Sequence, residues 1–139
     1  MRRSAQIVFT ERRKFSRHSL VSLYRANQWS SAEKPLLLKK GLAASHAIVS
    51  AWQGNRLVGL ANTLSDGHLV VYYSHMLVHP EFQGQGIGTQ LMLRLMEKYQ
   101  RFHQHILVAD GRAIEFYKKF GFKRAGKTEP MWIYSGHDH

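Results

Sequence analysis

The sequence contains no cysteine, only three prolines and few acidic residues. Without cysteine, a disulfide framework, a thiol nucleophile and a zinc site built on thiolates are all excluded. No apolar run approaches the roughly 20 residues that span a bilayer, and the first residues lack the apolar stretch of about 7–15 residues that a secretory signal needs. We therefore expect a soluble, cytoplasmic protein that has no membrane partner.

The chain does have a large positive charge and enough apolar residues for a core. Twenty Lys and Arg face nine Asp and Glu among 139 residues, a formal net charge of +11 at pH 7, and 44% of the residues are hydrophobic. Residues 1–40 carry a net charge of +8, residues 41–93 of −1 and residues 94–139 of +4. This surplus indicates an anionic partner, such as nucleic acid, a membrane surface or a polyphosphate cofactor. The length is that of one domain, so we expect residues 1–139 to form a single domain.

The order of local patterns predicts a mixed α/β sheet with helices on its faces. Strand patterns occur at 6–10, 46–53, 56–64, 68–78, 105–109 and 131–134, and helical patterns at 16–26, 35–43, 86–101 and 112–120. The resulting order, β-α-α-β-β-β-α-β-α-β, joins an antiparallel meander to a strand–helix–strand–helix–strand half. Ligands of such sheets lie at the carboxyl ends of strands, which directs attention to the strand that ends near Val78.

A glycine-rich turn follows that strand and leads directly into an amphipathic helix. It reads Val78-His79-Pro80-Glu81-Phe82-Gln83-Gly84-Gln85-Gly86-Ile87-Gly88-Thr89. Glycine admits positive φ and lets an anion approach the backbone N–H groups, and a helix N-terminus favours phosphate. Thr89 stands where the dinucleotide fingerprint needs its third glycine, and the Gly-Lys-Ser/Thr of a Walker loop is missing. The turn is therefore either a different phosphate-binding loop or a tight loop that only starts a helix.

Two motifs, in this order along the chain, resemble the GNAT superfamily of N-acetyltransferases. Gln83-x-x-Gly86-x-Gly88 matches the family's Gln/Arg-x-x-Gly-x-Gly/Ala signature, and residues 113–122 are similar to its Ala-Ile-x-Phe-Tyr-x-Lys-x-Gly-Phe segment. The resemblance covers residues 46–122 closely and the first forty residues only by layout. It implies the GNAT-like acyl-CoA N-acyltransferase fold. It also implies an N-acetyltransferase that moves an acetyl group from acetyl-CoA to a primary amine, of a small molecule or a protein, by direct transfer in a ternary complex.

The resemblance also implies which residues hold acetyl-CoA. Backbone N–H groups of the turn would bind the pyrophosphate, and the free edge of the fourth strand would pair with the pantetheine arm and polarise the thioester carbonyl. By position, the implied residues are Met76, Leu77, Val78, Gln83, Gly84, Gln85, Gly86, Ile87, Gly88 and Thr89. The basic residues near the second motif either meet the negative charge of CoA or lie on a solvated face; they are Arg112, Lys118, Lys119, Lys123 and Arg124.

Two residues are candidates for proton transfer. Tyr117 occupies the family's usual tyrosine, and its phenol, with an ordinary pKa of about 10, would protonate the departing thiolate. The alternative for Tyr117 is a core position on an apolar helix face. The acceptor amine needs a base, and His75 on the fourth strand, with an ordinary pKa of about 6.5, is the titratable candidate. A water-relayed proton path is the alternative to His75.

The acceptor site would be framed by the first two helices. Tyr24, Trp29 and Tyr72 could form an aromatic wall for an amine, although a tryptophan that fills the core between two helices explains Trp29 equally well. Met131–Tyr134 is apolar enough to be either core or the surface of a possible homodimer.

Hypotheses from other functional classes rest on weaker patterns. Arg2-Arg3, Arg12-Arg13-Lys14 and Arg17 suggest a basic nucleic-acid-binding module, but no reading motif accompanies them, so nucleic acid is an unlikely partner. A CoA sensor without turnover, on the same fold, is the other alternative. No metal site is expected, because no third group of ligands at a suitable spacing accompanies His103-x-His105 and the terminal His137-Asp138-His139.

Overall fold

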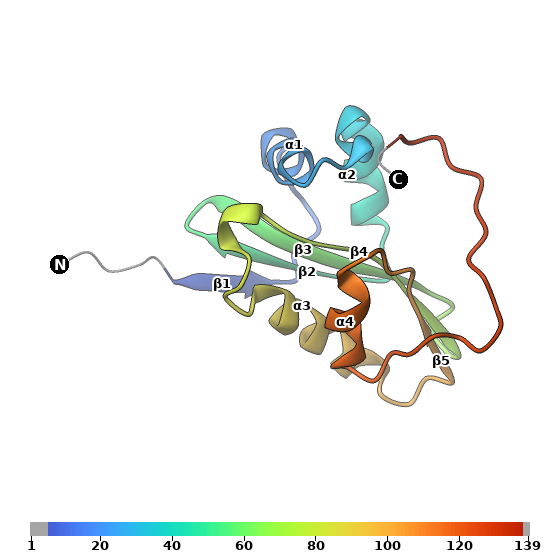
Figure 1. Cartoon of the computed structure of the whole chain (residues 1–139). Coiled ribbons are helices and arrows are strands. Elements are labelled where there is room, and N and C mark those ends of the chain that lie inside the picture. Colours follow the sequence, from blue (N-terminus) through green and yellow to red (C-terminus); the bar gives the residue numbers. More distant parts are fainter. Residues whose placement is uncertain (1–5, 138–139) are drawn as a thin grey trace.

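A computed structural model describes residues 6–137 of the chain (Figure 1). Its elements are, in order, β1 (Ile7–Thr10), α1 (Arg17–Ala26), the 3-10 turn η1 (Ser30–Glu33), α2 (Pro35–Ala43), β2 (Ala47–Gln53), β3 (Arg56–Ser65), β4 (Val70–Val78), η2 (Pro80–Phe82), α3 (Ile87–Met96), η3 (Glu97–Tyr99), β5 (Gln104–Ile106) and α4 (Ala113–Lys118). The strands form one sheet in the order β1-β2-β3-β4-β5, antiparallel throughout except for the parallel pair β4–β5. The predicted mixed sheet is confirmed.

Helices α1 and α2 cover one face of this sheet (Figure 1). Ser16 caps α1, accepting the N–H of Ser19, and Pro35 opens α2, as their sequence signals predict. The buried side chains of this face come from both helices and from β2, β3 and β4: Leu20, Leu23, Tyr24, Leu38, Leu42, Ile48, Trp52, Leu57, Leu60 and Leu77. This layer holds the C-terminal end of α1 against the middle of β4.

Helices α3 and α4 cover the opposite face (Figure 1). Leu91, Met92 and Leu95 of α3 are completely buried against the sheet, and aromatic side chains around α4 pack against the same cluster. The predicted helix over 86–101 ends as an α-helix at Met96 and continues as the 3-10 turn η3. Tyr99 fixes that turn, because its hydroxyl lies 2.6 Å from Thr63 Oγ1 and 2.7 Å from His46 Nδ1.

A bulge in β4 decides which side chains face which helices. Asn62 of β3 is opposite His75, but the next residue of β3, Thr63, is opposite Tyr73, so Ser74 is an extra residue in β4. Tyr73 therefore faces α3, while His75 and Leu77 face α1 and Met76 faces α3. Simple alternation would have put Tyr73 and His75 on one face.

The late part of the chain departs from the sequence prediction. Residues 131–134 form no strand, and Met131 and Ile133 are 94% and 105% exposed. The segment runs outside the sheet and ends near α1 and α2 (Figure 1), where the Tyr134 hydroxyl lies 3.3 Å from Ser30 Oγ. An apolar, strand-forming sequence does not make a strand unless a neighbouring edge pairs with its backbone.

The fifth strand is also shorter and more exposed than predicted. It spans three residues instead of the predicted 105–109, and Ile106 and Val108 are 39% and 58% exposed. Because no strand of the described chain pairs with its outer edge, β5 is an edge strand and is not the buried strand that its apolar residues suggested. Helix α4 is likewise shorter than the predicted 112–120.

Candidate functional site

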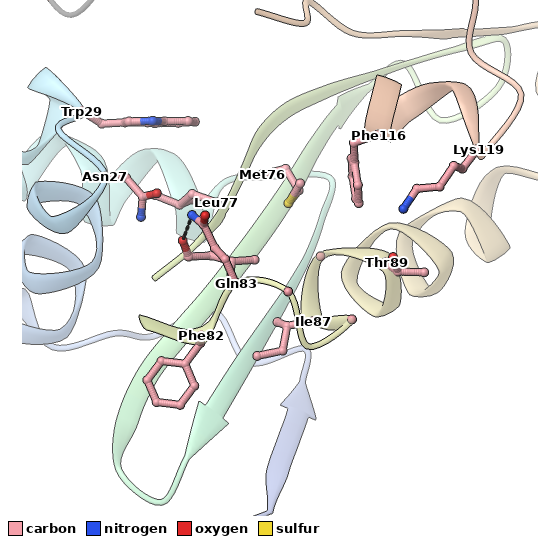
Figure 2. A pocket seen from close by; sticks show the side chains of 14 residues that line it. Asn27, Trp29, Met76, Leu77, Phe82, Gln83, Ile87, Thr89, Phe116 and Lys119 are labelled. Carbon is pink, nitrogen blue, oxygen red and sulfur yellow. Dashed lines mark hydrogen bonds between the residues drawn. The ribbon is translucent and has the colours of Figure 1, made fainter. Parts of the chain in front are cut away.

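A pocket of about 480 Å³ lies at the carboxyl end of β4 (Figure 2). Asn27 and Trp29, after α1, lie at one end, and Phe116 of α4 and Lys119, the residue that caps α4, lie at the other. Between them are β4 and the glycine turn, and every residue that the sequence assigns to CoA lines the pocket except Gln85: Met76, Leu77, Val78, Gln83, Gly84, Gly86, Ile87, Gly88 and Thr89. The pocket thus joins the turn to the end of α1.

The floor of the pocket is the start of α3. Gly86 is the N-cap residue with φ +82°, a left-handed conformation that glycine adopts without strain. A Cβ on Gly88 would lie 3.3 Å from Cζ of Phe116 and 3.6 Å from Cε of Met76, so a larger residue would enter the pocket. The first backbone N–H groups of α3 have no intrahelical partners, and the N-cap residue provides no side-chain hydrogen bond to them. Donors at a helix N-terminus attract an anion.

Two contacts fix the walls of this end of the pocket. Gln83 donates from Nε2 to the carbonyl oxygen of Val78 at 3.0 Å, which ties the turn to the end of β4 (Figure 2). On the other side, the Lys119 ammonium lies 4.7 Å from the centre of the Phe116 ring. Lys118, its neighbour, is instead paired with Glu115 at 2.9 Å and does not line the pocket. One cation of α4 is therefore directed to the site and the other is not.

The edge of β4 beside the pocket is open. Strand β5 pairs with β4 only at Val70, Val71 and Tyr72, so the part of β4 from Tyr73 to Val78 has no partner strand on this side among the described residues. Free backbone N–H and C=O groups on such an edge can pair with an extended ligand. Because β5 ends at Ile106, this side of the site is open.

The turn after α1 places Trp29 at the other end of the pocket. Gln28 has φ +61°, which is unusual for a residue with a Cβ, and the N–H of Trp29 donates back to the carbonyl of Tyr24 at 3.0 Å. Asn27 donates from Nδ2 to the carbonyl of Leu23 at 3.0 Å. A strained residue held by surrounding contacts thus turns the chain back so that Trp29 reaches the pocket.

Tyr24 does not line the pocket as the sequence prediction placed it. Its side chain is completely buried, and its hydroxyl lies 2.8 Å from Nδ1 of His75. The two rings and Trp29 form a cluster, with the Trp29 and His75 ring centres 5.1 Å apart and nearly perpendicular. Tyr72 is half-buried on β4 and is likewise not in the pocket lining. Of the three predicted wall residues, only Trp29 faces the cavity.

Burial sets the ionisation of this cluster. Burial lowers the pKa of His75 from 6.5 to about 4, and it raises the pKa of Tyr24 above the ordinary range. Both groups are therefore neutral near pH 7. A neutral imidazole keeps one donor nitrogen and one acceptor nitrogen.

Tyr117 lies on α4 beside the pocket without lining it. Its ring packs between Phe116 and Phe122, with ring centres 5.1 and 6.1 Å away. Burial raises the pKa of Tyr117 to about 12. The phenol therefore holds its proton at neutral pH, as a general acid requires.

Part of the N-terminal basic charge has an internal use. Arg13 donates to the carbonyls of Ala43, Ser45 and His46, at the end of α2, and the Arg12 guanidinium lies 3.8 Å over the Trp52 ring. Arg2 and Arg3 lie outside the described residues. Two of the basic residues on which a nucleic-acid-binding interpretation depends thus make structural contacts within the protein.

Over residues 6–137, no cluster of three or more His, Cys, Asp or Glu side chains is placed to hold a metal ion. Asp138 and His139 lie outside that range. No helix in the described part of the chain combines the length and apolarity needed to cross a membrane.

Sequence reasoning missed Asn27, Phe82 and Phe116 as pocket residues. Phe116 had a signal, because it precedes Tyr117 in the second motif and stands three residues before Lys119, which places both on one helix face. Asn27 and Phe82 had none, since their approach to the pocket depends on how α1 and η2 pack.

The model of the Acetyltransferase (GNAT) family matches residues 12–122. Among curated proteins, the chain is 31% identical over 113 residues to the uncharacterized N-acetyltransferase ycf52 of Gracilaria tenuistipitata var. liui, covering 76% of this chain and 60% of that protein. It is 30% identical over 122 residues to a ycf52-like N-acetyltransferase of Prochlorococcus marinus, covering 83% and 67%. The chain thus spans three fifths of the Gracilaria relative's length.

Solved structures share the fold. A GNAT-family acetyltransferase of Streptococcus pneumoniae matches with a TM-score of 0.80 and 26% identity, over 94% of this chain and 99% of that one. The aminoglycoside N-acetyltransferase AAC(6')-Iy, solved in complex with CoA, matches with a TM-score of 0.68 over 96% of this chain and 97% of that one. At 15% identity, the second likeness concerns the fold alone.

Proposed function

This chain belongs to the acetyltransferase (GNAT) family, and we propose that it transfers an acetyl group from acetyl-CoA to a primary amine by direct transfer in a ternary complex. The observation that carries this proposal is the single pocket that joins the glycine turn and the open edge of β4 to Trp29. Such a pocket can hold a phosphate-bearing donor and an amine acceptor at the same time.

The residues present fit CoA. The N–H groups at the start of α3, together with Thr89 and the Lys119 ammonium, offer donors and positive charge to the pyrophosphate. The absence of a Cβ at Gly88 avoids a close contact with Phe116 and Met76 at this point of the pocket. The unpaired edge at Met76–Val78 suits the extended pantetheine arm, and a backbone N–H near Leu77 would polarise the thioester carbonyl. When bound, acetyl-CoA supplies the acetyl group and a thiolate leaving group.

We assign the acid role to Tyr117. Its phenol keeps a proton at neutral pH, and α4 holds it beside Phe116 at the edge of the pocket. The proton would go to the sulfur as the carbon–sulfur bond breaks and the new carbon–nitrogen bond forms, and solvent would then reprotonate Tyr117. The amine enters with a lone pair, and its surplus proton leaves either to His75 or through water.

The acceptor would lie at the Trp29 end of the pocket. Trp29 offers an aromatic face to an amine or to an apolar body next to it, and Asn27 offers an amide. Tyr72 lies farther along β4, on the same face as His75. The buried Tyr24 supports the site through its contact with His75. Activity in the cytoplasm stays a prediction.

The test of this function is a calorimetric titration of CoA and acetyl-CoA into three forms of the chain. Wild type and the control variant Gly41→Leu should bind saturably. A Cβ at residue 41 would meet no atom within 4 Å apart from its chain neighbours and the backbone of its own helix. Gly88→Leu places its side chain in the pocket and should weaken binding about 100-fold or more, near 2.7 kcal/mol. A thermal unfolding curve for each form checks that the chain is folded. No binding to folded wild type at millimolar ligand would overturn the proposal.

The acceptor is then sought by thiol release from acetyl-CoA. The panel holds phenethylamine, spermidine, kanamycin and a lysine-containing peptide, which differ in aromatic content, charge and size. The basic first forty residues disfavour a polycation such as spermidine, because like charges repel.

We also propose that the exposed run Met131–Tyr134 is the surface of a homodimer. The exposure of Met131 and Ile133 leaves an apolar strip on the surface, and such strips mark contact sites between proteins. Light scattering should find a dimer that a Met131→Ser, Ile133→Ser double variant converts to monomer. Leu37→Ser, on the exposed surface of α2, is the control and should leave the dimer intact. A wild-type monomer at high concentration would contradict the proposal.

A further inference from the structure

The pair Tyr24–His75 is the polar contact that joins α1 to β4 beneath the pocket. Its two residues are 51 positions apart, and the hydroxyl oxygen of Tyr24 lies 2.8 Å from Nδ1 of His75. Tyr24 is completely buried, and its hydroxyl has no other hydrogen-bond partner among residues 6–137. The direction of this bond can therefore be deduced.

A buried phenol must place its hydrogen on an acceptor. If Nδ1 of His75 carried a hydrogen and donated it to Tyr24, the hydroxyl hydrogen would be buried without a partner, which is costly. Tyr24 therefore donates and Nδ1 accepts. Burial lowers the pKa of His75 to about 4, so the ring is neutral near pH 7 and carries its single hydrogen on Nε2.

The backbone of His75 is fixed as firmly as its ring. Its N–H donates to Oδ1 of Asn62 at 2.9 Å, Nδ2 of Asn62 donates to Oγ of Ser45 at 2.8 Å, and that hydroxyl donates to the carbonyl of Gly41 at 3.2 Å. The bulge at Ser74 and this chain of bonds hold His75 toward α1, where its ring packs nearly perpendicular to the ring of Trp29. Trp29 lines the pocket and His75 does not, so His75 lies next to the acceptor end without being part of its lining.

The Nε2 atom of His75 is not fully enclosed by the protein. Within residues 6–137, every buried side-chain nitrogen or oxygen has a hydrogen-bond partner, while Nε2 has none in that range. It follows that part of the Nε2 surface is left uncovered by residues 6–137. An N–H donor thus lies next to Trp29.

We propose that Tyr24 is a positioning residue that fixes His75 with its hydrogen on Nε2, so that His75 donates a hydrogen bond to an oxygen of the acceptor molecule. This inference rests on the proposed acetyl transfer. It decides between the two routes left for the surplus proton of the amine, to His75 or through water. A nitrogen that already carries a hydrogen cannot take the proton of the amine, so that proton leaves through water. The favoured acceptors carry an oxygen close to the amine and an apolar or aromatic body for Trp29.

The first test is the imidazole nitrogen spectrum of the full chain labelled with ¹⁵N-histidine, near pH 7. His75 is assigned by the signals that disappear in His75→Gln. The expected spectrum has an unprotonated Nδ1 and a protonated Nε2, and Tyr24→Phe should convert it to a mixture of tautomers. The matched control is Tyr73→Phe, which removes the similar 2.8 Å contact to Nδ1 of His105 on the opposite face and should leave His75 unchanged. A proton on Nδ1 in wild type would overturn the inference.

The second test separates a donor from a base by kinetics with the best amine of the panel. Glutamine carries an N–H donor on a side chain of similar reach but cannot take a proton at neutral pH. A donor role predicts that His75→Gln is about tenfold or more faster than His75→Ala, a difference near 1.4 kcal/mol. Equal losses in both variants would mean that His75 takes the proton. Calorimetric CoA binding, expected to persist in all these variants, distinguishes failure of this inference from failure of the proposed function.

Discussion

The two ends of the pocket differ in whether backbone groups or side chains form them. The end at α3 consists of backbone: a left-handed Gly86, a Gly88 under Phe116 and the free N–H groups of a helix start. The end at α1 consists of side chains, namely Trp29 and the buried pair Tyr24–His75. A backbone site needs only the local conformation that a short motif specifies, whereas a side-chain site needs several elements to pack in register.

This difference predicts which function each end serves. A backbone site recognises a group common to all reactions of the enzyme, such as a pyrophosphate, and tolerates change in its neighbours. A side-chain site can be altered residue by residue, which suits the choice of an acceptor. The following substitutions test this division.

The largest effect is expected from Tyr117→Phe, which removes the proposed acid and leaves the backbone site intact. The turnover number should fall about 10²–10⁴-fold, because a general acid contributes that much. Steady-state thiol release measures it, and calorimetry should find CoA binding unchanged. If CoA binding and turnover fell in parallel, Tyr117 would be part of the binding site and not the acid.

A smaller effect, on stability alone, is expected from Tyr99→Phe. This change removes the contacts of the Tyr99 hydroxyl with Thr63 and His46 on the α3 face, away from both ends of the pocket. The free energy of unfolding in urea should fall by about 1–3 kcal/mol, since buried polar groups lose a partner. The affinity for CoA should not change. A weaker affinity would mean that the frame and the site are coupled.

Lys119→Ala should weaken CoA binding modestly. One charge at a partly exposed site is worth up to about 1 kcal/mol, which corresponds to a three- to fivefold rise in Kd at low salt. The control is Lys118→Ala, one residue away on α4 but paired with Glu115. The difference between the two variants should shrink as salt is added. Equal effects of the two variants would show that only the net charge of α4 matters.

The smallest expected effect is that the contribution of Tyr117 to turnover does not change with pH. An acid works only while protonated, so its contribution is lost as the pH rises through its pKa. Because burial raises the pKa of Tyr117 to about 12, the ratio of wild-type to Tyr117→Phe turnover should stay constant from pH 8 to 10. With the ordinary pKa of about 10, that ratio would fall about twofold by pH 10.

Local signals predicted most of the elements that hold the site. The Ser16 cap, Pro35 at the start of α2 and Gly86 before α3 each act within one turn of helix, and each stands where it was expected. Residues 131–134 had equally clear strand propensity but form no strand, because pairing depends on an edge far away in the sequence.

The same contrast holds within the site. The glycine turn was predicted because its geometry depends on its own residues. The contact of Tyr24 with His75 was not predicted, since the face on which His75 lies relative to Tyr73 depends on the bulge at Ser74, and that bulge is visible only in the register between β3 and β4. A pattern of alternating residues contains no signal for one extra residue in a strand.

The most direct measurement of the central claim is an amide chemical-shift titration of the ¹⁵N-labelled chain with CoA. Our account predicts that the largest changes fall on the backbone amides of residues 84–89, followed by those at the edge of β4, with little change along the exposed face of α1. Shifts concentrated on the basic residues of α1, with the amides of Ile87, Gly88 and Thr89 unmoved, would contradict it.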